Sequence, residues 1–348
     1  MSEPREPQGR AVDKGPLRLG TRRSQLAMAQ SGLVADAVSQ VTGRPVELVE
    51  ITTHGDTSRE NLAQIGGTGV FVTALRDALL RGEVDFAVHS LKDLPTAQPD
   101  DLVLAAVPVR EDPRDVLVAR DGLTLAELTA STPERPVRIG TGSPRRMAQL
   151  NAYARNHGMT IETVAIRGNV GTRIGYVRSG ELDAVVLAAA GLNRLGRIEE
   201  VAEFLSADTV LPAPGQGALA IECAADNADL VAALGELDDP FTRAAVTAER
   251  SLLAALEAGC SAPVGALADL PQALDFARAG GTSTADGQVV KEMRLRGVVG
   301  TTDGSTLVQL STTGPVPETY DQAMALGREL AAEMLAKGAA GLMGERAL

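Results

Sequence analysis

Residues 249–265, ERSLLAALEAGCSAPVG, mark the point where the chain changes from one folding pattern to another. Three leucines recur there at helical spacing, which predicts a helix with one apolar face. Gly259 is expected to end this helix just past its last apolar residue, and Pro263 to prevent it from resuming. Cys260 would then lie on a short loop held by a rigid element, either as a reactive thiol or as a small buried apolar side chain.

Upstream of this stretch, strand-like and helical patterns alternate in two series. The first series starts at Leu17, and the second follows a charged joint at 110–115 (REDPRD). Such alternation predicts mainly parallel sheets with right-handed crossovers. Two prolines and two glycines within 211–217 mark a second crossing, just before a strand at 218–222. After Pro240 a long helix, strand-like runs and a terminal helix indicate an α+β unit.

We therefore predict an α/β protein with two doubly wound domains and a smaller α+β domain at the C-terminal end. The first domain would comprise 17–109 and 217–238, the second 110–216 and the third 239–348. Residues 1–16 are polar and rich in Pro and Gly, and we expect them to form a disordered lead-in.

Composition excludes several classes of protein. A chain of 348 residues is longer than a domain with a single hydrophobic core usually is, so we expect two or three domains. A formal net charge of −12 with only 2% aromatic residues argues against a general nucleic-acid surface. Cys223 and Cys260 have no CxxC partner and the three histidines are scattered, so we expect no metal. Cys223 falls on a predicted strand and is expected in the core, and so few cysteines fit a reducing compartment.

No segment of the sequence predicts export or membrane insertion. The N-terminal residues lack the apolar core of a signal peptide, and the longest apolar run, 184–192, is too short to span a bilayer. We therefore expect a soluble cytoplasmic protein with no nucleic-acid or membrane partner.

One set of charged residues lies where ligands bind in sheets of this type, beyond the carboxyl ends of the strands. Two such sheet edges facing each other across the 110–115 joint would form a cleft lined by cations. Helix N-termini capped by Ser24 and Ser143, together with planar guanidinium groups, favour carboxylates. Several such sites together suggest a polycarboxylate, and without a GxxxxGK[ST] or GxGxxG motif a nucleotide is disfavoured. The charged residues are Arg22, Lys92, Asp93, Arg145, Arg146, Arg167, Arg173 and Arg194.

With these motifs in view, nearly the whole chain from Leu17 onward resembles the porphobilinogen deaminase (hydroxymethylbilane synthase) family. The resemblance rests on ordered, uncommon strings: TRRS at 21–24, GEVDFAVHSLKDLP at 82–95, REDPRD at 110–115, GTGSPRR at 140–146, RGNVGTR at 167–173, LAAAGLNRLG at 187–196, PGQG at 214–217 and EAGCSAPVG at 257–265.

The resemblance implies a fold, an activity and a cofactor. The two lobes would be periplasmic-binding-protein-like, and the α+β domain would carry the cofactor cysteine. The enzyme, a transferase, would join four porphobilinogen molecules head to tail with release of ammonia and then free hydroxymethylbilane, in tetrapyrrole (porphyrin, haem) synthesis. A dipyrromethane primer would be held by a thioether to Cys260, and the protein would be a monomer.

Residue roles follow from the same resemblance. Asp93, with Lys92 before it, would be catalytic, because a carboxylate near a pyrrole N–H stabilises positive charge that develops when ammonia leaves. The implied cofactor-binding residues are Cys260, Ser24, Lys92, Asp93, Ser143, Arg145, Arg146, Arg167, Gly168 and Gly191. The implied substrate-binding residues are Arg22, Phe71, Arg167, Arg173, Arg194 and Gln216.

The main alternative is a bilobal organic-anion binding protein without catalysis. Two α/β lobes would suit it, but it predicts an export signal or lipoprotein cysteine, and it gives the third domain and Cys260 no role. A ligand-sensing regulator is less favoured because no helix-turn-helix precedes the lobes. The chain also departs from the family pattern at Gln64, Thr68, His54 and Pro144. These departures weaken the assignment of family roles to the loop at 66–69, which we interpret as a flexible cover.

Overall fold

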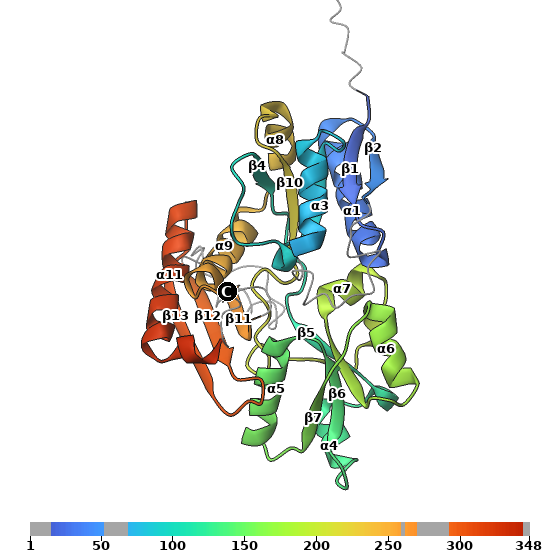
Figure 1. Cartoon of the computed structure of the whole chain (residues 1–348), viewed down its shortest axis with the longest axis vertical. Coiled ribbons are helices and arrows are strands. Elements are labelled where there is room, and N and C mark those ends of the chain that lie inside the picture. The colour runs from blue at the N-terminus through green and yellow to red at the C-terminus, as the bar shows by residue number, and fades with distance from the viewer. Residues whose placement is uncertain (1–14, 52–68, 259–261, 270–291, 344–348) are drawn as a thin grey trace, which may run out of the picture.

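The computed structural model describes residues 15–51, 69–258, 262–269 and 292–343, without the side chains of 69–71. Within these residues the chain forms two five-stranded sheets and one three-stranded sheet. Figure 1 shows the two larger sheets at the upper and lower ends of the molecule and the third beside them. Several residues singled out in the sequence lie outside the described part: His54, Gln64, Thr68, Gly259 and Cys260.

The first sheet has the strand order β2-β1-β3-β10-β4. Its strands are β1 (Leu17–Thr21), β2 (Val46–Glu50), β3 (Phe86–Ser90), β4 (Leu102–Ala106) and β10 (Leu219–Ala224). β1 pairs in parallel with β2 and β3, whereas β10 is antiparallel to both β3 and β4. The accompanying helices are α1 (Gln25–Thr42), α3 (Gly69–Leu80), the 3-10 turn η1 (Leu91–Asp93) and α8 (Ala228–Gly235).

The second sheet has the order β7-β6-β8-β5-β9 and repeats this layout. Its strands are β5 (Asp115–Ala119), β6 (Val137–Thr141), β7 (Ile161–Ala165), β8 (Ala184–Ala188) and β9 (Glu203–Phe204). β6 is parallel to β7 and β8, and β5 is antiparallel to β8 and β9. The helical segments are η2 (Arg120–Gly122), α4 (Leu125–Ala130), α5 (Pro144–Asn156), α6 (Val170–Arg178), α7 (Ala189–Arg194) and η3 (Ile198–Glu200).

In each sheet, therefore, one strand runs against the other four. In the second sheet that strand is β5, with which the chain enters the second unit. In the first sheet it is β10, with which the chain returns to the first unit. The two crossing segments touch: the Arg110 Nε donates to the Gln216 carbonyl at 2.8 Å, and the Glu111 amide to that of Gly217 at 3.3 Å. The predicted joint and return crossing thus lie side by side at the junction between the sheets.

The third sheet is antiparallel in the order β11-β12-β13. Its elements are β11 (Val264–Asp269), β12 (Glu292–Gly300), β13 (Leu307–Pro315), the helices α9 (Pro240–Ala255) and α11 (Tyr320–Ala336), and the 3-10 turn η4 (Ala339–Leu342). Side chains from α9 and α11 pack on the strands in one buried cluster that includes Leu252, Leu295, Leu330 and Met334. This arrangement agrees with the predicted α+β unit.

The prediction that Gly259 ends the long helix is wrong. α9 ends at Ala255, and Glu257 adopts the left-handed conformation with φ 52°. The Ala258 amide donates to the Leu253 carbonyl and the Glu257 amide to that of Ala254, which is the hydrogen-bond pattern of a Schellman cap. These bonds satisfy the last carbonyls of the helix, so the chain turns before a glycine is reached.

The β12–β13 hairpin links the third sheet to the second. The Asn151 Nδ2 of α5 donates to the Thr302 carbonyl at 2.7 Å, and the Arg155 Nε to that of Asp303 at 3.3 Å. Gly304 has φ 70°, and a Cβ there would collide with the backbone at Ala152. The hairpin tip therefore packs directly on α5.

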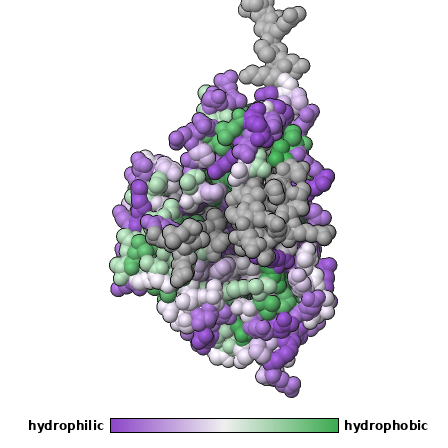
Figure 2. Space-filling model, in the orientation of Figure 1, coloured by the Kyte–Doolittle hydropathy of each residue, from purple (hydrophilic) through white to green (hydrophobic). Residues whose placement is uncertain are grey.

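The predicted fold class, two mixed α/β units with mainly parallel strands plus a smaller α+β unit, is confirmed. On the face drawn in Figure 2, hydrophilic residues predominate at the outer ends and hydrophobic ones form small separate areas. Cys223 is buried in β10 as predicted, and burial raises the pKa of its thiol to about 11. No described helix is long and apolar enough to cross a bilayer.

Candidate active site

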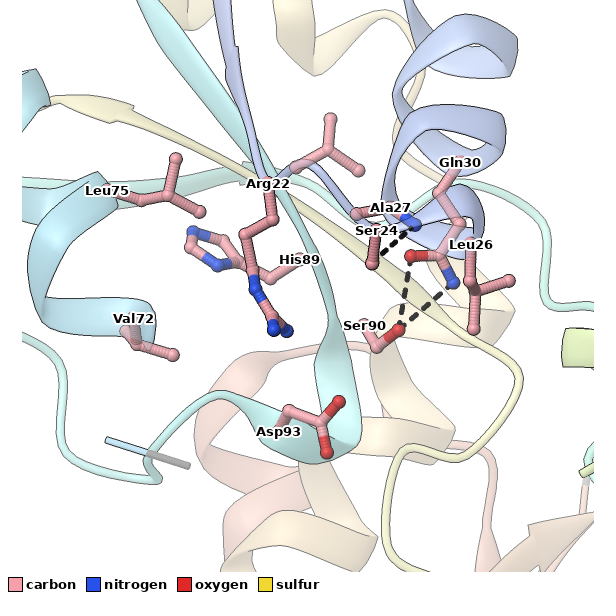
Figure 3. A pocket seen from close by; sticks show the side chains of 11 residues that line it. Arg22, Ser24, Leu26, Ala27, Gln30, Val72, Leu75, His89, Ser90 and Asp93 are labelled. Carbon is pink, nitrogen blue, oxygen red and sulfur yellow. Dashed lines mark hydrogen bonds between the residues drawn. The ribbon is translucent and has the colours of Figure 1, made fainter. Parts of the chain in front are cut away.

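A pocket opens in the first unit between the β1–α1 link, α3 and the end of β3. Figure 3 shows Arg22 and Asp93 reaching into it from opposite sides, with Val72 and Leu75 of α3 along one wall. Its polar lining consists of Arg22, Ser24, Gln30, His89, Ser90 and Asp93. The pocket brings together residues from two separate sequence motifs: the cation Arg22 and the helix cap Ser24 from 21–24, and the proposed catalytic carboxylate Asp93 from 82–95.

Both predicted serine caps are confirmed. The Ser24 Oγ accepts from the Ala27 amide at 3.3 Å and begins α1. The Ser143 Oγ accepts from the Arg146 amide, with Pro144 at the first position of α5. Each cap occupies one of the free amides of its helix, and the positive end of the helix dipole remains at the site.

A buried carboxylate supports the pocket from behind. Glu222 of β10 accepts from the Arg76 Nη2 at 2.8 Å and from the Gln98 Nε2 at 3.3 Å, and the His89 Nε2 lies 3.2 Å from its Oε2. Burial disfavours the charge of Glu222, but these partners outweigh that effect and lower its pKa. The His89 ring is thereby placed at the inner wall of the pocket.

A second group of buried polar residues lies in the second unit, around Asp115 at the start of β5. The Asp115 Oδ2 accepts from the Arg145 Nη2 at 2.8 Å and its Oδ1 from the Arg146 Nη2 at 2.7 Å, and all three side chains are buried. The two guanidinium groups also donate to the carbonyls of Leu211 and Val186. Burial opposes ionisation of Asp115, but the two positive charges hold its pKa well below the ordinary range.

Gln216 joins this buried group to the Lys92–Asp93 turn. Its Nε2 donates to Asp115 Oδ1 at 2.8 Å and to the Pro113 carbonyl at 2.7 Å, while its Oε1 accepts from the Lys92 Nζ at 3.4 Å. Burial, which disfavours its charge, lowers the pKa of Lys92 to about 8, even though the residue keeps partial exposure. Arg146 adds to the lowering and Asp93 opposes it.

Two further predicted arginines lie near the junction. The Arg194 Nη2 of α7 donates to the Gly217 carbonyl at 2.7 Å, and the Arg173 Nε of α6 to that of Gly168 at 2.9 Å. Burial lowers the pKa of both guanidinium groups, and for Arg173 the charge of Arg146 adds to this effect. Cations from α5 and α6 are therefore close enough to interact.

Of the two predicted glycines, Gly168 is required by the backbone conformation, whereas Gly191 has room for a Cβ. Gly168 has φ 108°, and a Cβ there would lie 2.8 Å from the Thr172 Cγ2. Gly191 faces the first unit, with its Cβ position 3.8 Å from the Leu26 Cδ2 of α1. Gly191 therefore marks a contact between the two α/β units beside the pocket.

Among the remaining predicted residues, one is described outside this group and two lie outside the described part of the chain. Arg167 is exposed and makes no hydrogen bond or ion pair within the described part of the chain. Phe71 belongs to α3, but its side chain lies outside the described residues, as does the whole of Cys260. Their roles stay predictions.

Sequence reasoning missed the two buried carboxylates Asp115 and Glu222. The available signal was an acidic residue at the start of an otherwise apolar strand, as in DVLVA, or within one, as in LAIECA. Such a residue is costly to bury unless it is paired, so it implies cationic partners elsewhere in the chain.

Comparison with known proteins decides the family. A model of the porphobilinogen deaminase dipyromethane cofactor binding domain matches residues 17–232, and a model of the porphobilinogen deaminase C-terminal domain matches 243–336. The chain belongs to the porphobilinogen deaminase family. It is 85% identical to porphobilinogen deaminase 1 of Streptomyces avermitilis, over 95% of this chain and 98% of that protein. It is 51% identical to porphobilinogen deaminase of Nocardia farcinica, over 97% and 90%.

Among solved structures, the chain is similar to the periplasmic VFT2 domain of BvgS from Bordetella pertussis. The identity is 16% over 64% of this chain and 86% of that chain, with a TM-score of 0.36.

The described residues fit the dipyrromethane cofactor of a porphobilinogen deaminase. The buried Arg146 Nε has no hydrogen-bond partner among them, so one strong donor is left for another group. The charges around it also favour an anion, since Asp115 faces three cations: Arg145, Arg146 and Lys92. An anionic pyrrole side chain at this position would supply the missing acceptor.

The lowered pKa of Lys92 predicts a pH effect on substrate binding. Lys92 is charged below pH 8 and loses its proton above it, so we expect KM for porphobilinogen to rise between pH 8 and 9.5. Lys92→Arg keeps the charge and should flatten this rise, as steady-state kinetics across that range will measure. The same rise in the Arg variant would assign the titration to another group.

The same pKa shift affects folding stability in the opposite direction: as pH rises, substrate binding should weaken but the folded protein should become more stable. The pKa of Lys92 in the folded protein, about 8, lies below the ordinary lysine pKa of 10.5, so the unfolded chain binds more protons between these two pH values. The contribution of Lys92 to the free energy of unfolding therefore rises with pH from 8 to 10.5, and Lys92→Met should remove that rise.

Proposed function

We propose that this chain is a transferase that condenses four porphobilinogen molecules head to tail, releases ammonia and frees hydroxymethylbilane for tetrapyrrole synthesis. The observation that carries the proposal is the continuous polar connection from the Lys92–Asp93 turn through Gln216 to Asp115, Arg145 and Arg146. It links a candidate catalytic carboxylate in one unit to a buried cation pair in the other.

The arginines would select the substrate by its charge. Porphobilinogen carries acetate and propionate groups, and guanidinium groups bind carboxylates through paired hydrogen bonds. We assign these contacts to Arg22, Arg146, Arg173 and Arg194, with the helix N-termini capped by Ser24 and Ser143 adding to the favourable field. In both Arg145 and Arg146 the two terminal nitrogens donate within the chain. Arg146 is assigned to the carboxylate because its buried Nε has no hydrogen-bond partner among the described residues, and Arg145 is assigned a supporting role.

Asp93 would perform the electrostatic part of the chemistry. Loss of ammonia leaves positive charge on the substrate pyrrole, and a carboxylate fixed near the pyrrole N–H lowers the free energy of that state. The same carboxylate could accept the proton that is lost after the new carbon–carbon bond forms. When bound through Cys260, the dipyrromethane supplies the pyrrole carbon from which the product chain grows.

The assay that tests this function uses the purified full chain and porphobilinogen. We expect four molecules of ammonia for each hydroxymethylbilane released, measured by coupled ammonia detection and by absorbance after oxidation to porphyrin. Saturable binding of porphobilinogen without ammonia release would instead indicate the bilobal binding protein.

We also infer that the enzyme acts as a monomer in the cytoplasm. The proposed site draws its polar residues from this chain and needs no residue from a second subunit. Sedimentation at micromolar concentration should give a mass near 36.1 kDa, and a stable dimer would contradict this inference.

A further inference from the structure

Arg250 of α9 makes an unusual set of contacts across a unit boundary. Its Nη1 donates to the carbonyls of Leu91 at 3.2 Å and Leu94 at 2.7 Å, and its Nη2 donates to that of Pro95 at 2.6 Å. All three acceptors belong to residues 91–95 of the first α/β unit, which comprise the η1 turn and the two residues after it. A single planar guanidinium thus binds three backbone oxygens of the same short segment.

That segment carries Lys92 and Asp93. Leu91 and Leu94, which flank them, are buried, and the Leu94 amide closes the turn on the Leu91 carbonyl at 3.1 Å. The Leu91 amide is held by the Ala218 carbonyl at 3.0 Å. The turn is only three residues long, so its position depends strongly on contacts from outside it.

The helix that presents Arg250 is itself firmly held. The neighbouring residue Glu249 is fully buried and accepts from the Arg110 Nη1 at 2.6 Å, from the Gly215 amide at 2.7 Å and from the Ala268 amide at 2.9 Å. These partners lie on both crossing segments and on β11. Glu249 therefore fixes α9 to the junction, and Arg250 extends that fixed frame to the turn.

We propose that Arg250 is a positioning residue, which sets where Asp93 stands in the pocket by holding the carbonyls on either side of it. This inference rests on the proposed function, in which Asp93 acts on the substrate. Arg250 lies behind the turn and acts through it. Its removal should therefore impair turnover more than substrate binding, because the arginines that bind carboxylates stay in place.

The same helix offers a matched control. Arg243, about two turns earlier in α9, donates to the carbonyls of Leu104 at 3.1 Å and Ala105 at 3.3 Å and to Asp238 at 2.6 Å. It also joins α9 to the backbone of the first unit, but at β4, away from the Lys92–Asp93 turn. Arg243→Met and Arg250→Met therefore remove comparable contacts between the same two units.

The experiment compares both variants, as full-length proteins carrying their cofactor, with the wild type. We expect Arg250→Met to lower kcat about 10- to 100-fold with KM within about 3-fold, since a displacement of about 1 Å near the chemistry costs up to about 100-fold. Arg243→Met should keep kcat within about 2-fold of wild type. Hydrogen exchange should accelerate at the Leu91 and Leu94 amides in Arg250→Met only. Arg250→Lys should recover part of kcat and serves as the test if the methionine variant does not fold.

Equal kcat in the Arg250 and Arg243 variants would overturn the proposal, because Arg250 would then only join two units. Unchanged exchange at Leu91 and Leu94 with a lowered kcat would overturn it too. Failure of the proposed function is distinguished by Asp93→Asn: normal turnover in that variant removes Asp93 from the chemistry. If Asp93→Asn is inactive and Arg250→Met and Arg250→Lys both turn over normally, only the positioning role is refuted.

Discussion

Asp93→Asn is expected to lower kcat by about 10²- to 10⁴-fold while the protein remains folded and retains its cofactor. The amide has nearly the shape of the carboxylate but no negative charge, so it can neither stabilise a cationic pyrrole nor accept a proton. Asp93 reaches into the pocket opposite Arg22, where a substrate pyrrole would lie between them. The loss should therefore appear in kcat, with KM changed much less.

The measurement is steady-state turnover of porphobilinogen, with cofactor content checked by intact mass. Asp101→Asn provides a control, because Asp101 is an exposed acidic residue outside the pocket lining. Turnover within a few-fold of wild type in Asp93→Asn would remove this carboxylate from the reaction and contradict the assigned mechanism.

Asp115→Asn is expected to reduce both stability and binding. The substitution leaves Arg145 and Arg146 buried beside a neutral group, and breaking a buried ion pair by removing one partner costs about 3–5 kcal/mol. Repulsion between the two cations should also displace Arg146 from the position proposed for carboxylate binding. We expect a lower denaturation midpoint, reduced cofactor content and a raised KM for porphobilinogen.

The stability difference has a defined pH window. The folded-state pKa of Asp115 is depressed, so its stabilising contribution is complete above the unfolded value of about 3.9 and is lost as pH falls through the folded value. Denaturation of wild type and Asp115→Asn between pH 4.5 and 7 should therefore show a constant difference in the free energy of unfolding.

Asp183→Asn is the matched control for that experiment. Asp183 is also a buried carboxylate, paired with Arg120 at 2.9 Å and Arg135 at 2.7 Å, but it stabilises the far end of the second sheet. The Asp183→Asn variant should have a lower free energy of unfolding, while its KM for porphobilinogen stays at the wild-type value. An equal rise in KM in both variants would show that Asp115 acts only through general stability.

Local features were well predicted because short-range physics decides them. The Ser24 and Ser143 caps depend on side chains that bond amides three residues away, and both caps are present. The strand-end placement of Lys92 and Asp93 follows from the buried run in β3 and the turn residues after it. The alternation of strands and helices likewise determined the two α/β units.

Features that depend on distant partners were not predicted. Asp115 meets Arg145, Arg146 and Gln216 at separations of 30, 31 and 101 residues, which no local pattern records. β11 was missed for a similar reason, because its pairing with β12 makes it a strand. The end of α9 was misplaced since a Glu, Glu257, takes the left-handed position that a glycine usually fills.

In the proposed enzyme one thiol, Cys260, tethers an anionic pyrrole primer near the arginines of the two α/β units. Intact-mass analysis of freshly purified protein tests it most directly, with Cys260→Ser and Cys223→Ser measured in parallel. We expect an adduct of two pyrroles on the wild type and on Cys223→Ser, and none on Cys260→Ser. An active wild-type protein at its unmodified mass, or an adduct that persists in Cys260→Ser, would contradict this tether.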